Sequence, residues 1–354
     1  MKQKDELYQS IEWRNGGLYI IDQTKLPAEE SVIHLENAEQ VWDAFRQLKV
    51  RGAPAIGITG AYGLYLGIRD FDGDAYSEFM RECRRLADYL NSSRPTAVNL
   101  SWALSYIMET LAGQEAKPLL ELKQKILKTA ISIHDEDRRL CKTIGENGVE
   151  LVPNGANILT HCNTGGLATG QYGTAFSVIF HAHQQGKVKQ VWVDETRPLL
   201  QGARLTTWEL QKASIQHSLI VDSAAGFLMS RGKVDMVITG ADRITKNGDT
   251  ANKIGTYMLS VLAKEHGIPF YVAAPYSTLD MDLDNGSQIE IELRDEKEVT
   301  AFNHQKSSPE GTKAYNPAFD ITPHQNISAI ITEKGIIYPE FEKNIQEVFK
   351  TPRE

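Results

Sequence analysis

Apolar and polar residues follow different periods on the two sides of residue 156 in this 354-residue chain. Residues 8–22 alternate around Asn15-Gly16-Gly17, which predicts a β-hairpin because Asn and Gly accept positive φ angles. Residues 31–35 predict a third strand. Apolar residues then recur at helical spacing, which predicts a cluster of helices. The predicted helices cover residues 38–48, 77–90, 97–111 and roughly 118–145.

From residue 156 onward, short apolar runs alternate with helical patterns. Repeated strand–helix units of this length predict a parallel, doubly wound sheet. The predicted strands are 157–161, 190–194, 218–222, 235–239 and 269–273. The helical patterns cover 174–185, 203–213, 223–230 and 253–266, and a short β pair follows at 327–332 and 335–338. Residues 279–311 are acidic and then polar, which indicates a mobile loop or a long surface excursion.

Composition narrows the classes of function. The net charge of −8 argues against a general nucleic-acid binder, because no broad basic face is available. The start MKQKDELYQS has no apolar core typical of a signal peptide. The uncharged run 52–68 is short and glycine-rich, which predicts a buried loop and helix and no membrane span.

Three cysteines are present, and their spacing favours a reducing cytoplasm over a disulfide framework. Cys83 and Cys141 fall inside helical patterns and are predicted to be packing residues. No C-x-x-C or H-x-x-x-H spacing indicates a metal site, so none is predicted. The turn GGLATG is not a dinucleotide fingerprint, and residues 49–57 do not form a Walker A loop, so no cofactor is predicted either.

The third cysteine, Cys162, stands where a predicted strand becomes a glycine-rich turn, residues 165–173. Ligands of parallel sheets bind at the carboxyl ends of strands, and the following helix N-terminus favours a thiolate or an anion. A buried cysteine in a plain connection is the alternative. Asp242 follows another predicted strand, and partial burial would raise its pKa and suit it to general acid–base catalysis. A helix cap or turn is the alternative role for this aspartate.

Further polar residues stand at strand ends and helix starts. Arg51 precedes a helix start at Pro54, and Arg94 lies in the turn 91–96, so each could bind phosphate or be simply solvated. Asn252 and Lys253 stand where the pattern predicts a helix to begin, a position suited to an anion or hydroxyls. Several such residues at one sheet edge indicate a site.

Six motifs, spread in order over most of the chain, resemble those of methylthioribose-1-phosphate isomerases. They are VRGAPAIG (50–57), SSRPTAVNL (92–100), LTHCNTGGLATGQYGTA (159–175), DETRPLLQGARLT (194–206), ITGADRI (238–244) and NGDTANKIGTY (247–257). The resemblance implies an α/β fold with a Rossmann-like catalytic domain, placed at residues 126–354. It also implies a smaller N-terminal domain of helices and a small antiparallel sheet, placed at residues 1–125, with the long helix bridging the two.

The resemblance also implies a reaction and its residues. The substrate would be 5-methylthioribose 1-phosphate, the product 5-methylthioribulose 1-phosphate, the pathway methionine salvage, and the protein a cytoplasmic homodimer without nucleic-acid or membrane partners. Cys162 and Asp242 match the catalytic residues. The matching substrate contacts are Arg51, Gly52, Ala53, Arg94, Gln201, Asn252 and Lys253.

Two alternatives stay open at the sequence level. Another sugar 1-phosphate isomerase would act on ribose 1,5-bisphosphate or 5-deoxyribose 1-phosphate, which differ at C5. A regulatory subunit of the exchange complex for a translation initiation factor would share the fold without catalysis. The chemistry of hydrogen transfer is open as well, because Cys162 could shuttle a proton through an enolate or stabilise a hydride shift.

Overall fold

The computed structural model describes residues 7–95, 97–302 and 305–350. The chain forms two compact units. Unit 1 contains the chain up to Leu140 together with Gly165–Gly173, and unit 2 contains Cys141–Thr164 and the chain from Thr174 on. The predicted division into domains after residue 125 stays a prediction.

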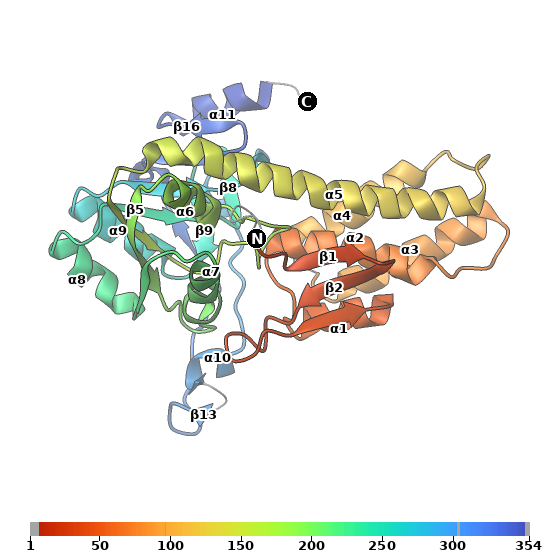
Figure 1. Cartoon of the computed structure of the whole chain (residues 1–354), viewed down its shortest axis with the longest axis horizontal. Coiled ribbons are helices and arrows are strands. Elements are labelled where there is room, and N and C mark those ends of the chain that lie inside the picture. The colour runs from red at the N-terminus through yellow and green to blue at the C-terminus, as the bar shows by residue number, and fades with distance from the viewer. Residues whose placement is uncertain (1–6, 96, 303–304, 351–354) are drawn as a thin grey trace. The chain divides into compact units, whose positions relative to one another are not determined.

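Unit 1 combines a small sheet with helices, as predicted (Figure 1). The sheet is antiparallel, in the order β1 (Ile11–Arg14), β2 (Gly17–Ile21) and β3 (Val32–Leu35). The helices are α1 (Ala38–Arg46), α2 (Ala53–Ile68), α3 (Tyr76–Ser92), α4 (Val98–Leu111) and the first part of α5 (Leu119–Gly148). Their apolar faces bury one core that includes Phe45, Tyr62 and Phe79.

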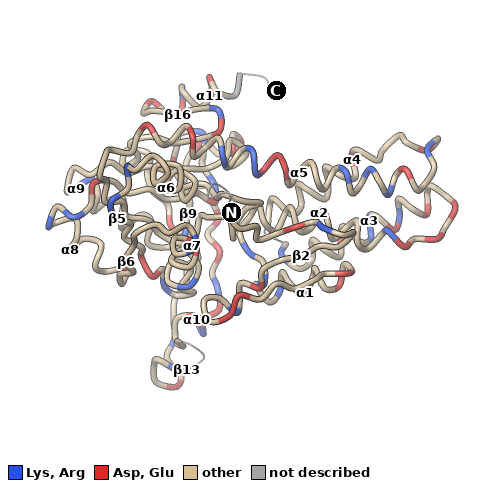
Figure 2. Tube along the Cα trace, viewed as in Figure 1, with Lys and Arg blue, Asp and Glu red and all other residues tan. Residues whose placement is uncertain are grey.

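Helix α5 is one continuous helix in Figure 1, and acidic and basic residues are mixed along it in Figure 2. Its residues up to Leu140 belong to unit 1 and those from Cys141 belong to unit 2. Cys83 on α3 and Cys141 on α5 are both buried, which confirms their predicted packing role.

Unit 2 is built on a seven-stranded sheet in the order β16-β15-β10-β7-β4-β5-β6. Its strands are β4 (Ala156–Thr160), β5 (Val188–Asp194), β6 (His217–Ile220), β7 (Met236–Thr239), β10 (Phe270–Ala273), β15 (Ala329–Thr332) and β16 (Gly335–Ile337). All neighbours are parallel except β15 and β16. The chain runs outward from β4 through β5 and β6, then returns to β7 on the other side of β4. This reversal is the topological switch point of a Rossmann-like sheet, and the predicted fold class is confirmed.

Helices connect these strands in the predicted places. They are α6 (Ala175–Gln184), α7 (Thr207–Lys212), α8 (Ala225–Ser230) and α9 (Thr256–Glu265). The C-terminal helix α11 (Phe341–Lys350) follows the last strand and was not predicted. A π-helical turn (Gly202–Thr206) precedes α7, and short 3-10 turns occur at Val149–Leu151, Asp222–Ala224, Tyr276–Thr278, Gly286–Gln288 and His324–Asn326. Along the described residues, no helix is both long enough and apolar enough to cross a membrane.

A second sheet in unit 2 was not predicted. It has the order β11-β8-β9-β14, with β11 (Leu279–Asp280), β8 (Arg243–Thr245), β9 (Thr250–Lys253) and β14 (Phe319–Thr322). The predicted start of a helix at residue 253 is therefore wrong, because Lys253 ends β9 and α9 begins at Thr256. The described residues of the predicted loop, 279–302 and 305–311, form short elements, namely β11, a 3-10 turn, α10 (Lys297–Thr300), β12 (Ala301–Phe302) and β13 (Gln305–Lys306).

Candidate active site

The two candidate catalytic residues follow the two strands that flank the switch point. Cys162 comes two residues after β4, and Asp242 comes three residues after β7. The strands pair in parallel, with Thr160 beside Ile238. A Cβ built on Gly240 would lie 2.8 Å from Cγ2 of Thr164, so the segments that carry the two residues are in close contact. Ligands of open α/β sheets bind in the crevice at this position.

The backbone of Cys162 is held by two threonine hydroxyls. Its amide donates to Oγ1 of Thr196 over 2.9 Å, and its carbonyl accepts from Oγ1 of Thr206 over 2.6 Å. Its φ angle is +62°, which is uncommon for a residue with a side chain. The residue is half-buried, unlike Cys83 and Cys141, so Cys162 is the most accessible of the three thiols.

Beside Cys162, His161 and Asp194 form a fully buried pair. Nδ1 of His161 lies 2.9 Å from Oδ2 of Asp194, and neither side chain is exposed to solvent. Nε2 lies 2.8 Å from the carbonyl of Ile254 and must donate, because a carbonyl only accepts. Burial alone would lower the pKa of His161, but the hydrogen bond and charge of Asp194 outweigh it and raise that pKa. Burial raises the pKa of Asp194 to about 6, against the effect of His161.

One group of side chains has the residue types of a metal site. Candidate ligand atoms of His161, Asp194 and Asp222 all lie within 4.8 Å of one another. Both ring nitrogens of His161 already bond within the protein, and the two carboxylate oxygens of Asp222 accept from the amides of Thr196 and Arg197. These atoms therefore have hydrogen-bond partners within the protein, whereas Oδ1 of Asp194 is buried and has none among the described residues.

Asp242 is exposed, so the predicted partial burial of this residue is wrong. Its segment leaves β7 directly into β8, which places the side chain at the rim of the sheet and not inside it. Its amide donates to the carbonyl of Ala251 over 2.9 Å. Since Arg243 pairs with Ala251 across the hairpin of β8 and β9, Asp242 stands opposite Asn252.

Asn252 and Lys253 lie in strand β9, not at the helix start predicted for them. Asn252 is buried, and its amide nitrogen donates to Oγ1 of Thr256 over 3.0 Å. Lys253 donates to the carbonyl of Ala318 over 2.9 Å and lies 4.5 Å from the ring centre of Phe319. The pairing of β9 with β14 therefore fixes both residues.

Gln201 is a buried residue directly before the π-helical turn. Among the described residues, nothing forms a hydrogen bond with its Oε1. A buried acceptor without a donor costs free energy unless a ligand or water supplies one. This atom is therefore suited to accept from a substrate hydroxyl.

The remaining predicted contacts lie in unit 1. Arg51 and Gly52 lead into α2, whose first residue is Ala53, and Arg51 is half-buried. Gly52 has a φ angle of +92°, and a Cβ there would lie 2.6 Å from the backbone of Ala168 in the glycine-rich turn. Only glycine fits this approach.

Arg94 is half-buried in the turn between α3 and α4. The first turns of α2 and α4 are in close contact, because a Cβ on Gly57 would lie 2.8 Å from the carbonyl of Asn99. The segments carrying Arg51 and Arg94 thus reach the same end of this helix pair.

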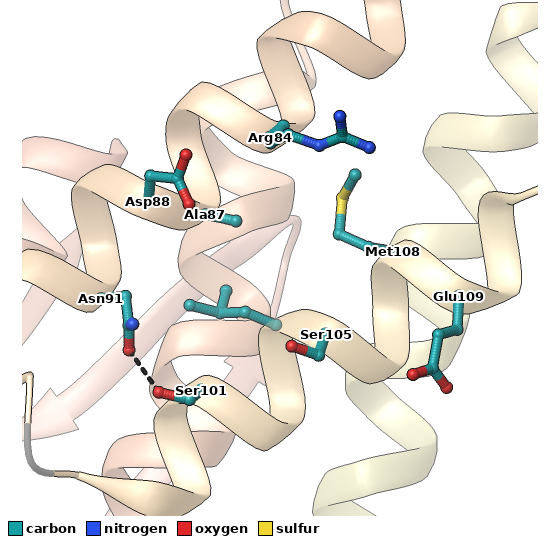
Figure 3. Close-up of a pocket in the computed structure, with 9 residues that line it drawn as sticks. Arg84, Ala87, Asp88, Asn91, Ser101, Ser105, Met108 and Glu109 are labelled. Atoms are coloured by element: carbon teal, nitrogen blue, oxygen red, sulfur yellow. Dashed lines mark hydrogen bonds between the residues drawn. The ribbon is translucent and has the colours of Figure 1, made fainter.

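A pocket of about 370 Å³ in unit 1 lies elsewhere, between α3 and α4 (Figure 3). Asn91 accepts there from the hydroxyl of Ser101 over 2.7 Å, and Arg84, Asp88 and Met108 also line it. Its described lining includes none of the predicted site residues.

Sequence reasoning missed several residues that build this site. Thr196 and Thr206 both lie in the motif DETRPLLQGARLT (194–206), but the motif predicts no role for either residue. Asp320 of β14 accepts from the amides of Gly255 and Tyr257 and thereby organises the start of α9. It lies far along the chain from its partners, so no local pattern could have indicated it.

Comparison with known proteins identifies the family. The sequence pattern of the initiation factor 2 subunit family matches residues 49–339. The chain belongs to this family. A relative from Moorella thermoacetica, named 5-deoxyribose 1-phosphate isomerase, is 53% identical over 96% of this chain and 96% of its own. Another from Geobacter sulfurreducens, named methylthioribose-1-phosphate isomerase, is 51% identical over 93% of this chain and 95% of its own.

Solved structures agree with these relatives. The 5-methylthioribose 1-phosphate isomerase of Pyrococcus horikoshii OT3 has a TM-score of 0.95 and 44% identity, covering 99% of this chain and 98% of that one. A structure titled translation initiation factor eIF-2B, subunit delta, from A. fulgidus has a TM-score of 0.89 and 44% identity, covering 97% and 99%. The resemblance to methylthioribose-1-phosphate isomerases inferred from the motifs is confirmed.

Proposed function

We propose that this family member is an aldose–ketose isomerase that converts 5-methylthioribose 1-phosphate to 5-methylthioribulose 1-phosphate in methionine salvage. Relatives with this name match it over nearly their whole length. The observation that carries the proposal is the placement of Cys162 and Asp242 after the two strands that flank the switch point. An acid and a thiol at the ligand-binding edge of the sheet suit an isomerisation at two adjacent carbons.

The reaction begins with ring opening, because phosphate on the anomeric oxygen prevents a free hemiacetal. Asp242 in its protonated form donates to the ring oxygen as the bond from C1 to that oxygen breaks. Hydrogen moves from C2 to C1. The C2 hydroxyl releases a proton as it becomes the carbonyl, and this proton replaces the one that Asp242 donated. Asp242 is exposed, so its carboxyl group exchanges protons with solvent.

The substrate contacts are proposed from position and chemistry. Arg51 and Arg94 supply cations for the phosphate, with the backbone of Gly52 and Ala53 at the start of α2. Lys253 on β9 suits the phosphate, and Asn252 on the same strand and the buried Gln201 oxygen suit the sugar hydroxyls. Substitution of Arg51 or Arg94 is expected mainly to raise KM, because these contacts bind ground state and transition state alike.

Two other functions have specific support. The relative named 5-deoxyribose 1-phosphate isomerase favours a substrate in which C5 itself is a methyl group. Ribose 1,5-bisphosphate is a third substrate that differs at C5. The structure titled eIF-2B subunit delta favours a non-catalytic assembly subunit. The presence of Cys162 and Asp242 together with Arg51 and Arg94 favours the enzyme.

An isomerase assay with all three sugar phosphates tests the proposal. Purified protein is expected to form ketose fastest from 5-methylthioribose 1-phosphate. Cys162→Ser and Asp242→Asn are each expected to lower kcat by about 10²- to 10⁴-fold, the usual contribution of a positioned acid or base. Asp284→Asn, an exposed aspartate that pairs with Lys246, is the matched control and is expected to keep parental kcat.

Each other outcome has a definite meaning. Faster turnover of another substrate transfers the proposal to that C5 substituent. No turnover by folded protein supports the assembly subunit, and activity that survives both substitutions shows that the site is elsewhere. In heavy water, deuterium at C1 of the product would support the proton shuttle, and full retention of the C2 hydrogen would favour the hydride shift.

We also propose a homodimer in the cytoplasm. Large apolar side chains are exposed together on α8 and α9 of unit 2, and Leu262 on α9 packs against Gly226 on α8. They are Phe227, Tyr257, Met258 and Val261. Exposed apolar surface shared by two helices is typical of a subunit contact. The cytoplasmic assignment is supported by the three cysteines, none of which forms a disulfide.

A further inference from the structure

We infer that Thr196 and Thr206 are positioning residues that clamp the peptide groups of Cys162 and so fix the direction of its thiol. The inference rests on the proposed function, in which this thiol takes part in hydrogen transfer. The two hydroxyl groups belong to unit 2 and form hydrogen bonds with the backbone of the candidate catalytic cysteine.

The Cys162 backbone needs such support. At a φ angle of +62°, it occupies the left-handed region, which costs a residue with a Cβ free energy and persists only where neighbouring groups enforce it. The backbone angles of Cys162 decide where its Cβ, and therefore its sulfur, points. Side-chain hydroxyls bind both the amide and the carbonyl of this residue.

Thr196 holds the amide side. Its Oγ1 accepts from the Cys162 amide over 2.9 Å and lies 3.1 Å from the carbonyl of Asp194, to which it donates its proton. Thr196 is itself at a φ angle of +63°. Asp222 fixes it by accepting from the amides of Thr196 and Arg197 over 2.7 and 2.8 Å. A Cβ on Gly202 would lie 2.9 Å from Thr196 Oγ1, so glycine leaves room for this arrangement.

Thr206 holds the carbonyl side. Its Oγ1 donates to the Cys162 carbonyl over 2.6 Å and accepts from Nδ2 of Asn163 over 3.2 Å. Asn163 also donates to Glu209, whose side chain is buried. Thr206 ends the π-helical turn, and insertions of this kind frequently occur at functional sites.

The two hydroxyls therefore have fixed roles. Each one donates to one group and accepts from another, so neither can rotate without losing a hydrogen bond. Valine in place of either threonine keeps the shape of the side chain and removes only the hydroxyl. Each substitution removes one hydrogen bond to the Cys162 backbone, and so weakens the restraint that holds it in the left-handed region.

The experiment compares Thr196→Val and Thr206→Val with Thr196→Ser and Thr206→Ser, which keep the hydroxyl. Thr207→Val is the matched control, because its hydroxyl bonds only to the carbonyl of Ala203 one turn earlier. Three quantities are measured on folded protein: kcat and KM for the sugar phosphate, and the rate of Cys162 alkylation by iodoacetamide between pH 6 and 10. Peptide mass spectrometry separates Cys162 from the buried Cys83 and Cys141.

Each valine variant is expected to lower kcat about tenfold to a hundredfold with little change in KM, since misplacing a reacting group by about 1 Å has effects of this size. The pH profile of Cys162 alkylation is expected to shift in the same variants. Serine restores both quantities, and Thr207→Val changes neither. Parental kcat and alkylation in both valine variants would overturn the inference, as would equal losses in valine and serine variants.

The readouts separate this inference from the proposed function. If the parent turns over no sugar phosphate, the proposed function fails, but the alkylation profile still reports whether the hydroxyls position Cys162. If Thr196→Val does not fold, Thr206→Val tests the same clamp from the carbonyl side. An unchanged alkylation profile in that variant would then count against the clamp.

Discussion

At the scale of single residues, the site depends on polar groups that the protein buries and pairs. His161 and Asp194 are fully buried at the carboxyl ends of β4 and β5, next to the candidate cysteine. A buried ion pair contributes little net stability. Removal of one partner is nevertheless strongly destabilising, because the other charge stays buried without a partner. The sequence indicated Cys162 and Asp242 by their positions after strands. It could not indicate this pair, because only the sheet brings the two residues within hydrogen-bond distance.

His161→Asn is expected to lower the free energy of unfolding by about 3 to 5 kcal/mol, since Asp194 loses its buried partner. Urea unfolding measures this, with the half-buried His183→Asn as control. A loss below 1 kcal/mol would mean that the pair is not coupled as described.

The pair also predicts a pH dependence. The pKa of His161 is raised in the folded state, so its contribution is fully present below pH of about 6.5 and is lost as pH rises through the folded value. The pKa of Asp194 is raised to about 6 in the folded state. Its protonated form therefore stabilises the folded protein at low pH, and this contribution is lost as pH rises from about 3.9 to about 6. The difference in unfolding free energy between parent and His161→Asn is therefore expected to shrink above pH 6.5. A difference that grows above this pH would contradict the assignment.

At the scale of elements, the predictable parts are those with a clear period. The strands of the large sheet are apolar runs between helical patterns, and all seven were predicted to within two residues at each end. The sheet of β8, β9, β11 and β14 was missed because its strands are two to four residues long and polar. Tertiary pairing, and not local propensity, makes Asn252 and Lys253 part of a strand.

Gly255 joins this small sheet to α9 and gives a test at the element scale. Its φ angle is +106°, and a Cβ would lie 2.8 Å from Cε1 of His161. Gly255→Ala is expected to cost more than the roughly 1 to 3 kcal/mol of backbone strain alone. Gly267→Ala is the matched control, because its φ angle is +65° and nothing lies within 4 Å of its Cβ position. Equal shifts in thermal unfolding would show that His161 does not confine the turn.

At the scale of the whole molecule, the proposed homodimer uses the apolar face of α8 and α9. Phe227 is 61% exposed there, and Leu120 on α5 is a matched control with 67% exposure. Light scattering is expected to report a dimer for the parent and for Leu120→Glu, and a monomer for Phe227→Glu, because a buried unpaired charge opposes association. A dimeric Phe227→Glu would place the subunit contact elsewhere.

The glycine-rich turn has a consequence for how this chain can be divided. Residues 165–173 belong to unit 1, although the chain on both sides belongs to unit 2. The buried Ser10 and Gln23 of unit 1 donate to the carbonyls of Gly166 and Leu167 over 2.5 and 2.7 Å. A gene fragment that stops after residue 140 encodes these donors without their acceptors. Recombination between relatives at a single crossover would therefore mismatch unit 1, and a functional chimera must exchange both of its segments together.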